Sequence, residues 1–215
     1  VVAIVGCAVA TGVGAVQNTA QLPAGATVAV IGCGGVGLSC IQGARIVGAS
    51  QIVAVDLVES KLALAVQLGA TDVVNASQGD VVAALRAAVP AGLDFVFDAI
   101  GAIATTEQAI ESLGMGGAAV VVGLPPNGER ATFDPMVLAE ADQRILGSNY
   151  GSCVPRRDIP ALVDAYMSGE LKLDEMISAR RPLDEAHDAL RALAGGTALR
   201  QLLLPNPGLA PRTSI

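Results

Sequence analysis

The chain has 215 residues, which is enough for one large domain with a buried core. Its formal net charge is −7 and only 15% of its residues are charged, so nucleic acid and anionic membrane are disfavoured as partners. Apolar residues make up 52% and aromatic residues 2%, so the core must consist of Val, Ile, Leu and Ala. That composition is typical of a parallel sheet buried on both faces by helices.

No charged residue precedes Arg45. A signal peptide would begin with basic residues, and none is present. A spanning helix needs about 20 consecutive apolar residues, whereas Pro23 and several Gly, Thr, Gln and Asn residues interrupt this run. We therefore interpret it as a buried core segment and expect no membrane partner. Because Val1 already lies inside the run, the chain is expected to start partway through a larger protein, or to be a complete one after ordinary processing.

The cysteines are spaced too widely to suggest a disulfide framework or a compact metal site. They stand at Cys7, Cys33, Cys40 and Cys153, with no CxxC pair among them. This pattern predicts free thiols and a cytoplasmic, reducing location.

Short runs rich in β-branched residues alternate with helical patterns along most of the chain. The predicted strands are Thr27–Ile31, Gln51–Val55, Asp72–Asn75, Asp94–Asp98, Ala118–Gly123 and Arg144–Ser148. The predicted helices between them are Gly35–Val47, Glu59–Leu68, Gln78–Ala88 and Thr105–Leu113. This alternation predicts an α/β fold, a doubly wound parallel six-stranded sheet of the Rossmann type, in a single domain with C-terminal helices.

Four regions follow from this pattern. Residues 1–24 form a lead-in helix or loop, and residues 25–150 form the Rossmann core. Residues 151–204 add the predicted helices Arg157–Ser168 and Leu183–Leu193 and a last strand, Leu199–Leu204, that packs back. Residues 205–215 are rich in proline and are expected to be a mobile tail.

The first predicted strand runs directly into Gly32-Cys33-Gly34-Gly35-Val36-Gly37, a G-x-G-x-x-G turn that opens a helix. Gly32 permits the tight turn, Gly34 lets a pyrophosphate approach the backbone, and Gly37 lets the helix pack closely on the sheet. The free N–H groups of the first helical turn, which includes Gly35 and Val36, then face the phosphates. Glycine turns without a ligand are also common, so the motif alone does not decide the function.

Asp56 at the end of the second predicted strand supplies the missing context. An acid at this spacing accepts hydrogen bonds from the adenine ribose hydroxyls. It also repels a 2′-phosphate by about 4 kcal/mol at roughly 4 Å and an effective dielectric near 20. Together, the glycine turn and Asp56 predict an NAD site that discriminates against NADP.

Six motifs in order match one family: Gly6-Cys7 with Thr11-Gly12, Gly32–Gly37, Val55-Asp56, Phe97–Gly101, Val121–Pro126 and Ala198–Leu202. With them the chain resembles the coenzyme-binding domain of zinc-dependent medium-chain alcohol dehydrogenases, nearest the branch of class III and related actinobacterial-type enzymes. The resemblance covers nearly the whole chain. It implies an NAD-dependent hydride transfer between NAD and a small-molecule alcohol or aldehyde, or a hydroxymethyl-thiol adduct.

The resemblance also implies roles for single residues. It places Cys7 at a catalytic-zinc ligand and Thr11 beside the nicotinamide as the catalytic position. In this assignment the adenosine ribose lies between Asp56 and Lys61, with Ile100 and Gly101 in the loop beside it, and Arg200 reaches the pyrophosphate. At the other end of the cofactor the resemblance implies backbone positions for the carboxamide at Val122, Ser148 and Tyr150, a further cofactor position at Gly123, and Leu124 between nicotinamide and substrate.

The other zinc ligands of that family come from an N-terminal domain, and this sequence does not contain them. The sole histidine is His187, in a predicted helix, where a surface role is expected. One thiolate does not make a zinc site, so we expect zinc in the intact enzyme only. Cys7 as a small buried residue, Lys61 as a solvated helix residue and Arg200 in a structural ion pair are the plain alternatives.

Three functions stay open at this point. The first is the coenzyme domain of a zinc alcohol dehydrogenase, expected to form a homo-oligomer through the edge near Ala118–Gly123 and Arg144–Tyr150. The second is a zinc-free, quinone-reductase-like member of the superfamily, against which Cys7 counts. The third is a non-catalytic NAD-binding fragment or module, which would bind NAD without alcohol-dependent turnover.

Overall fold

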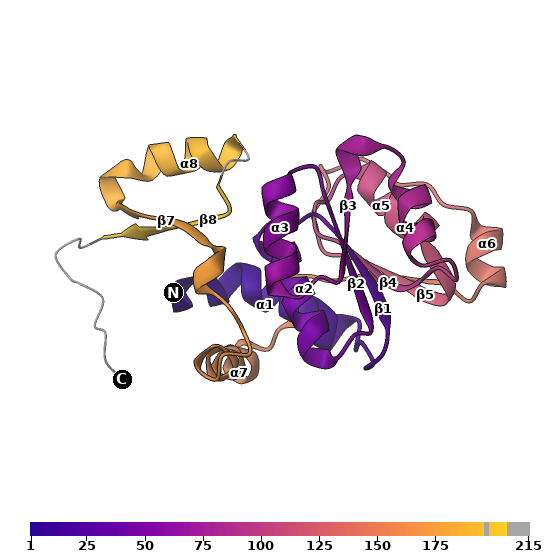
Figure 1. Ribbon diagram of the computed structural model, residues 1–215, viewed down its shortest axis with the longest axis horizontal. Helices are drawn as coiled ribbons and strands as arrows, with labels where there is room; N and C mark the ends of the chain where they lie inside the picture. Colours follow the sequence, from indigo (N-terminus) through magenta and orange to yellow (C-terminus); the bar gives the residue numbers. More distant parts are fainter. Residues whose placement is uncertain (196–197, 206–215) are drawn as a thin grey trace.

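The computed structural model describes residues 1–195 and 198–205, and its centre is a six-stranded parallel sheet (Figure 1). The strand order is β3-β2-β1-β4-β5-β6. This order confirms the predicted doubly wound Rossmann sheet, with a change of winding direction between β1 and β4. The strands are β1 (Thr27–Ile31), β2 (Gln51–Asp56), β3 (Asp72–Asn75), β4 (Leu93–Asp98), β5 (Leu113–Val121) and β6 (Arg144–Gly147).

The two faces of the sheet are covered by different helices because side chains alternate along each strand. In β1, Val28 and Val30 belong to one buried cluster with residues of α2 (Gly35–Val47) and α3 (Glu59–Leu68). Ala29 and Ile31 belong to a second cluster with residues of α4 (Val81–Ala88) and α5 (Ile103–Glu111). Both faces of the sheet are therefore buried under helices, as the apolar composition predicted.

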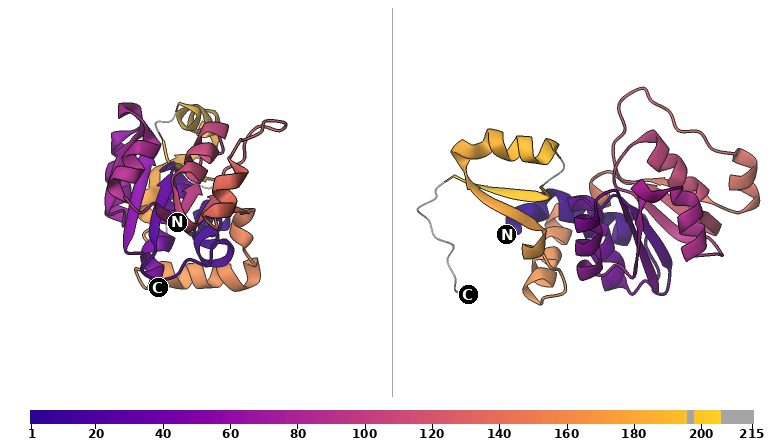
Figure 2. Two further views of the ribbon diagram at one scale, coloured as in Figure 1. Left: turned by 90° about the vertical axis from the view of Figure 1, so that its right-hand side faces the viewer. Right: turned by 45° about the horizontal axis from the view of Figure 1, so that its top comes forward.

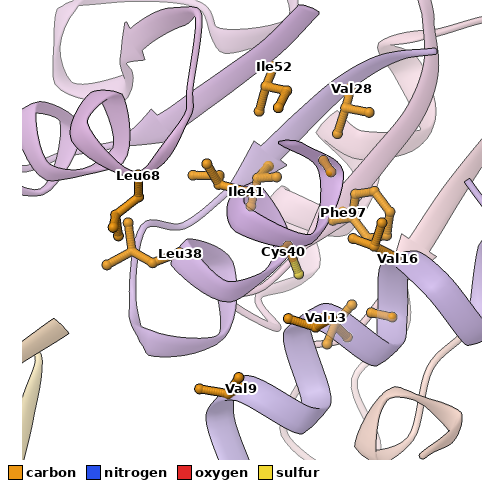
Figure 3. Close-up of a cluster of buried hydrophobic side chains, with 14 of the residues drawn as sticks. Val9, Val13, Val16, Val28, Leu38, Cys40, Ile41, Ile52, Leu68 and Phe97 are labelled. Atoms are coloured by element: carbon orange, nitrogen blue, oxygen red, sulfur yellow. The ribbon is translucent and has the colours of Figure 1, made fainter. Parts of the chain in front are cut away.

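A helical segment over Val2–Thr19 packs beside α2 on the first face. It consists of η1 (Val2–Ile4), η2 (Val5–Val9), α1 (Ala10–Gly14) and η3 (Ala15–Thr19), of which η2 and η3 have π-helical geometry. Figure 3 shows Val9, Val13 and Val16 directed toward the core that contains Cys40 and Phe97. The segment is long and apolar enough to cross a membrane, but it is 56% buried in the protein, and a buried core helix passes the same test.

Past β6 the chain builds a smaller unit beside the main sheet (Figures 1 and 2). Strands β7 (Ile177–Pro182) and β8 (Arg200–Leu204) pair in parallel as a separate two-stranded sheet, with Ile177 opposite Arg200. Between β6 and β7 the chain forms η5 (Tyr150–Ser152), α7 (Pro155–Met167) and η6 (Asp174–Met176), and between β7 and β8 it forms η7 (Leu183–Glu185) and α8 (Ala186–Ala194). Helix α6 (Pro135–Glu140) instead lies between β5 and β6, at the opposite end of the molecule (Figure 1). Strand β7 was not among the predicted strands, because its two arginines and its proline hide the strand pattern. The expected tail beyond residue 205 lies outside the described residues.

Local hydrogen bonds correct two predicted helix boundaries. The helix expected from Gln78 begins at Val81, because the Asp80 carboxylate accepts the N–H groups of Val82 and Ala83 and caps it there; Gln78 instead ends the short helix η4 (Ala76–Gln78). The helix expected to reach Leu113 ends at Glu111, since Leu113 already pairs with Leu93 as the first residue of β5.

The other boundaries shift by a few residues. The strand expected at Ala118–Gly123 runs from Leu113 to Val121, across a register shift opposite Leu93–Phe95. The helix expected at Arg157–Ser168 is α7, and the one expected at Leu183–Leu193 divides into η7 and α8. Such differences are the usual uncertainty of helix and strand ends.

Candidate coenzyme site

The glycine turn between β1 and α2 has the geometry that its sequence predicted. Gly32 has φ of +99°, and its N–H donates to the Val55 carbonyl over 2.7 Å. A Cβ at Gly37 would lie 1.7 Å from the Gly32 carbonyl oxygen, so α2 packs against the turn in a way that only glycine permits. A Cβ at Gly34 would meet no atom within 4 Å, so this part of the turn is open to a ligand.

The first turn of α2 presents unpaired backbone donors beside that opening. Gly34 is the N-cap and offers no side chain to the first N–H groups of the helix. A cavity of about 240 Å³ adjoins this helix end. Its lining includes Gly34, Gly35, Val36, Lys61 and Arg200, so the structure brings these predicted residues together. The positive end of the helix dipole favours an anion here.

Arg200 reaches this helix end from β8. A Cβ at Gly35 would lie 2.1 Å from Arg200 Nε, so the guanidinium lies directly on the glycine turn. Arg200 Nε is buried and has no hydrogen-bond partner among residues 1–195 and 198–205. A buried unpaired donor on a charged group is costly. A phosphate oxygen is a group that satisfies it, so the residues present fit the pyrophosphate of a dinucleotide.

Asp56, the last residue of β2, faces the same turn. Its Oδ2 accepts the Cys33 N–H over 2.8 Å, and its Oδ1 accepts the Val58 N–H over 3.0 Å. Lys61 Nζ lies 4.0 Å from Oδ1, and the Asp56 side chain is 10% exposed. The carboxylate therefore holds the glycine turn in place, in addition to the ribose role predicted for it. This structural role was not predicted from the sequence.

A second acid, the buried Asp98 at the end of β4, organises the next loop and was not singled out from the sequence. Its Oδ1 accepts the N–H groups of Ile100 and Gly101 over 3.0 and 3.1 Å and the Thr105 hydroxyl over 3.0 Å. Its Oδ2 accepts the Thr106 hydroxyl over 2.7 Å. The signal was available in the sequence, since an acid that ends a buried strand requires several donors.

The loops that follow β1, β4 and β5 contact one another at the carboxyl ends of these parallel strands. A Cβ at Gly32 would lie 2.5 Å from Ile100 Cγ1, and a Cβ at Gly123 would lie 2.2 Å from the Gly101 nitrogen. The N–H groups of Val122 and Gly123 both donate to the Asp98 carbonyl, over 3.0 and 2.8 Å. The crevice at the change of winding direction, where open α/β sheets bind ligands, is thus built from these loops.

Leu124 projects beyond these loops and is 84% exposed. The side chains of Ser148 and Tyr150, which follow β6 and were predicted as carboxamide positions, lie against the N-terminal helical segment. The Ser148 hydroxyl is 2.8 Å from that of Thr19, and the Tyr150 hydroxyl donates to the Gly6 carbonyl over 2.5 Å.

The two N-terminal candidates are Thr11 and Cys7. Thr11 is half-buried, and a Cβ at Gly151 would lie 2.6 Å from its carbonyl oxygen, which places Thr11 against the chain that follows Tyr150. Cys7 is exposed, so the buried alternative does not hold for it. Within the described ranges no three His, Cys, Asp or Glu side chains cluster as a metal site. These residues alone do not fit a zinc ion.

The other thiols are packing groups. Burial raises the pKa of Cys33 and of Cys40 to about 12. The Cys33 thiol donates to the Val55 carbonyl over 3.7 Å. Cys153 is half-buried in a loop, as expected, and His187 is exposed on α8.

Comparison with known proteins points to one family. Residues 35–168 match the family model described as zinc-binding dehydrogenase. The chain is 39% identical over 207 residues to S-(hydroxymethyl)glutathione dehydrogenase of Saccharomyces cerevisiae, which covers 93% of this chain and 53% of the relative. It is 36% identical over 210 residues to alcohol dehydrogenase class-3 of Cereibacter sphaeroides, which covers 93% of this chain and 55% of the relative.

A solved structure agrees with this match. The alcohol dehydrogenase zinc-binding domain protein of Burkholderia ambifaria superposes with a TM-score of 0.91 at 38% identity, over 94% of this chain and 55% of that one. The chain therefore spans about half the length of the relatives it matches.

Proposed function

The chain belongs to the zinc-binding dehydrogenase family, and from that premise we propose that it is the coenzyme-binding part of an NAD-dependent alcohol dehydrogenase of the class III type. The observation that carries the proposal is the buried, unpartnered Arg200 Nε against Gly35 at the open end of α2. A dinucleotide pyrophosphate supplies the anion that this arrangement requires.

The rest of the cofactor is assigned along the same crevice. Asp56 and Lys61 take the adenosine ribose, and the loop at Ile100 and Gly101 lies beside it. The nicotinamide end is assigned to the region of Val122–Leu124, Ser148 and Tyr150, with Thr11 close to the segment after Tyr150. When bound, NAD accepts the hydride; this chain binds it, orients it and keeps its phosphates neutralised.

A preference for NAD over NADP follows from Asp56. Its carboxylate is already held by two backbone N–H groups, which keeps it in place where a 2′-phosphate would enter. Lys61 at 4.0 Å reduces this repulsion without abolishing it.

The activity of the whole enzyme is proposed from the family. In that assignment Cys7 is one zinc ligand, exposed in the first turns of the N-terminal helical segment and joined by ligands from outside the described residues. The substrate class is a small alcohol, aldehyde or hydroxymethyl-thiol adduct, the location cytoplasmic, and the assembly a homo-oligomer. The exposed β6 residue Ile145 lies on the sheet edge available for such an assembly.

One observation favours a second candidate, a coenzyme-binding module without turnover of its own. The described residues hold the elements of a dinucleotide site but no group of three metal-ligating side chains. Adding an alcohol, NAD and zinc separates the two. NADH formation by this chain would favour a complete enzyme, and NAD binding without NADH would favour the module.

The direct test is a calorimetric titration of NAD into the wild-type chain, Arg200→Met and the matched control Arg144→Met. Arg144 is an exposed arginine on β6 that donates to the Gly116 carbonyl, far from the glycine turn. Loss of one charge-assisted contact predicts a Kd about ten- to a hundredfold higher for Arg200→Met only. If the wild type binds no dinucleotide, or if Arg200→Met binds as tightly, the proposal is wrong.

A further inference from the structure

A buried glutamine in α2 has no explanation in the coenzyme site itself. Gln42 is fully buried and lies on the second half of α2, the helix whose first turn faces the phosphates. Its Oε1 accepts the Lys172 N–H over 2.7 Å, and its Nε2 donates to the Lys172 carbonyl over 3.0 Å. The side chain therefore pairs with both backbone groups of one residue, 130 positions away.

Lys172 belongs to the segment that leads into the small β7–β8 unit. Met176, whose sulfur lies 3.4 Å from Gln42 Nε2, immediately precedes β7. In β7, Ile177 pairs with Arg200, and the Ser178 hydroxyl donates to the Arg200 carbonyl over 2.9 Å. One continuous path thus joins the middle of α2 to the residue that lies on its first turn.

The path contains two kinds of contact, apolar packing and hydrogen bonds, and only the hydrogen bonds set the position of a residue along the chain. Leu171, Leu173 and Met176 are buried in the core that includes α2. Apolar contacts of this kind hold the segment down but are not directional. Two hydrogen bonds to one residue's N–H and carbonyl set its position along the chain, and leaving either group unpaired in a buried place is unfavourable.

We infer that Gln42 is a positioning residue for the coenzyme phosphates. It holds the Lys172 backbone on α2 and thereby sets where Arg200 lies over Gly35. The inference rests on the proposed NAD site for its consequence, but the mechanical link between Gln42 and β8 stands on the contacts alone. Because the same helix carries both the phosphate-binding turn and the glutamine, Gln42 fixes the spacing between the two phosphate-binding groups.

The link is tested without cofactor by hydrogen exchange in Gln42→Met, a variant of similar volume. We expect faster exchange in β7 and β8 and unchanged exchange in α4 and α5. The matched control is Gln143→Met, since Gln143 also donates to backbone carbonyls, those of Leu113 and Gly114, but at the opposite end of the sheet. Unchanged exchange in β7 and β8 of Gln42→Met, or equal effects of both variants, would overturn the link whatever the ligand.

The consequence is tested by a double-mutant cycle in NAD affinity. Gln42→Met should raise the Kd by about three- to tenfold, because a displaced Arg200 loses part of a charge-assisted contact. In the Arg200→Met background the same change should leave the Kd within about twofold, since no contact is left to displace. A purely structural role of Gln42 predicts equal losses in both backgrounds, and that result refutes the inference.

A third measurement uses only the wild-type chain, so it decides the inference even if Gln42→Met does not fold. In the wild-type chain, saturating NAD should slow exchange of the Lys172 amide, which lies away from the cavity beside the glycine turn, because coupling is reciprocal. No change at that amide, with NAD shown to bind, overturns the inference. Failure of NAD to bind the wild type refutes the proposed function instead, while the exchange comparison still decides the link.

Discussion

Replacing Asp56 by asparagine should narrow the preference for NAD over NADP. The substitution removes the negative charge but keeps an oxygen that accepts either the Cys33 or the Val58 N–H. The other N–H then faces an amide, so some loosening of the glycine turn is expected. The quantity to measure is therefore the ratio of the affinities for NAD and NADP. A looser glycine turn weakens both cofactors alike, so its effect cancels in that ratio.

The size of the effect follows from the charges at the site. A carboxylate about 4 Å from a phosphate is worth roughly 4 kcal/mol at an effective dielectric near 20, or about a thousandfold in binding. Lys61 and Asp56 side chains are 21% and 10% exposed, so water screens part of this repulsion. We therefore expect the ratio of the NADP and NAD dissociation constants to fall about a hundredfold.

The assay is a pair of calorimetric titrations at fixed ionic strength, with Asp72→Asn as the control. Asp72 begins β3, at the opposite end of the strands from the glycine turn, and its loss changes net charge equally. A ratio that changes less than about threefold in Asp56→Asn, or equally in both variants, would show that the carboxylate does not face the ribose 2′ position.

Two further outcomes follow from packing and burial. Gly34→Ala should leave the melting temperature near that of the wild type but weaken NAD, because its Cβ meets nothing within 4 Å. Gly37→Ala should destabilise the chain by about 1–3 kcal/mol or more, because its Cβ would lie 1.7 Å from a carbonyl oxygen; equal thermal stability of the two variants would contradict this account. For the thiols, a pKa of about 12 leaves Cys33 and Cys40 protonated well above neutral pH. Iodoacetamide at pH 8 should therefore label exposed Cys7 first, as mass spectrometry can follow, with Cys33 reacting only as pH rises toward 12 or the chain unfolds. Early labelling of Cys33 would show that the turn opens.

The features predicted correctly from the sequence are local ones. The turn at Gly32–Gly37 lies within one strand–turn–helix unit, so its spacing alone fixes which glycine bends, which is open and which packs. The core was predictable for a similar reason, because alternation in short strands determines which face each residue joins. Helix ends were less predictable, since one side chain such as that of Asp80 moves the first turn.

What the sequence could not reveal depends on contacts between distant segments. Strand β7 lacks an apolar pattern of its own and becomes a strand by pairing with β8. Arg200 was assigned to the phosphates by resemblance and because a charge inside an apolar strand pattern needs a partner. Nothing near it in the chain indicates that it lies on Gly35. Gln42 looks like an ordinary helix residue until Lys172 is brought beside it.

The position of Arg200 has a consequence for how the two units of the fold depend on the coenzyme. A guanidinium against the first turn of α2 places a positive charge beside the positive end of a helix dipole, which disfavours close approach. A pyrophosphate bound beside both groups brings two negative charges, so each group is attracted to the phosphates and their mutual repulsion is offset. A ligand that binds only when Arg200 lies against the first turn of α2 stabilises that arrangement by mass action. NAD is therefore expected to stabilise the contact between the β7–β8 unit and α2. By reciprocity, any contact that already holds the unit there, such as that of Gln42 with the Lys172 backbone, raises the affinity for NAD by the factor by which NAD stabilises that contact.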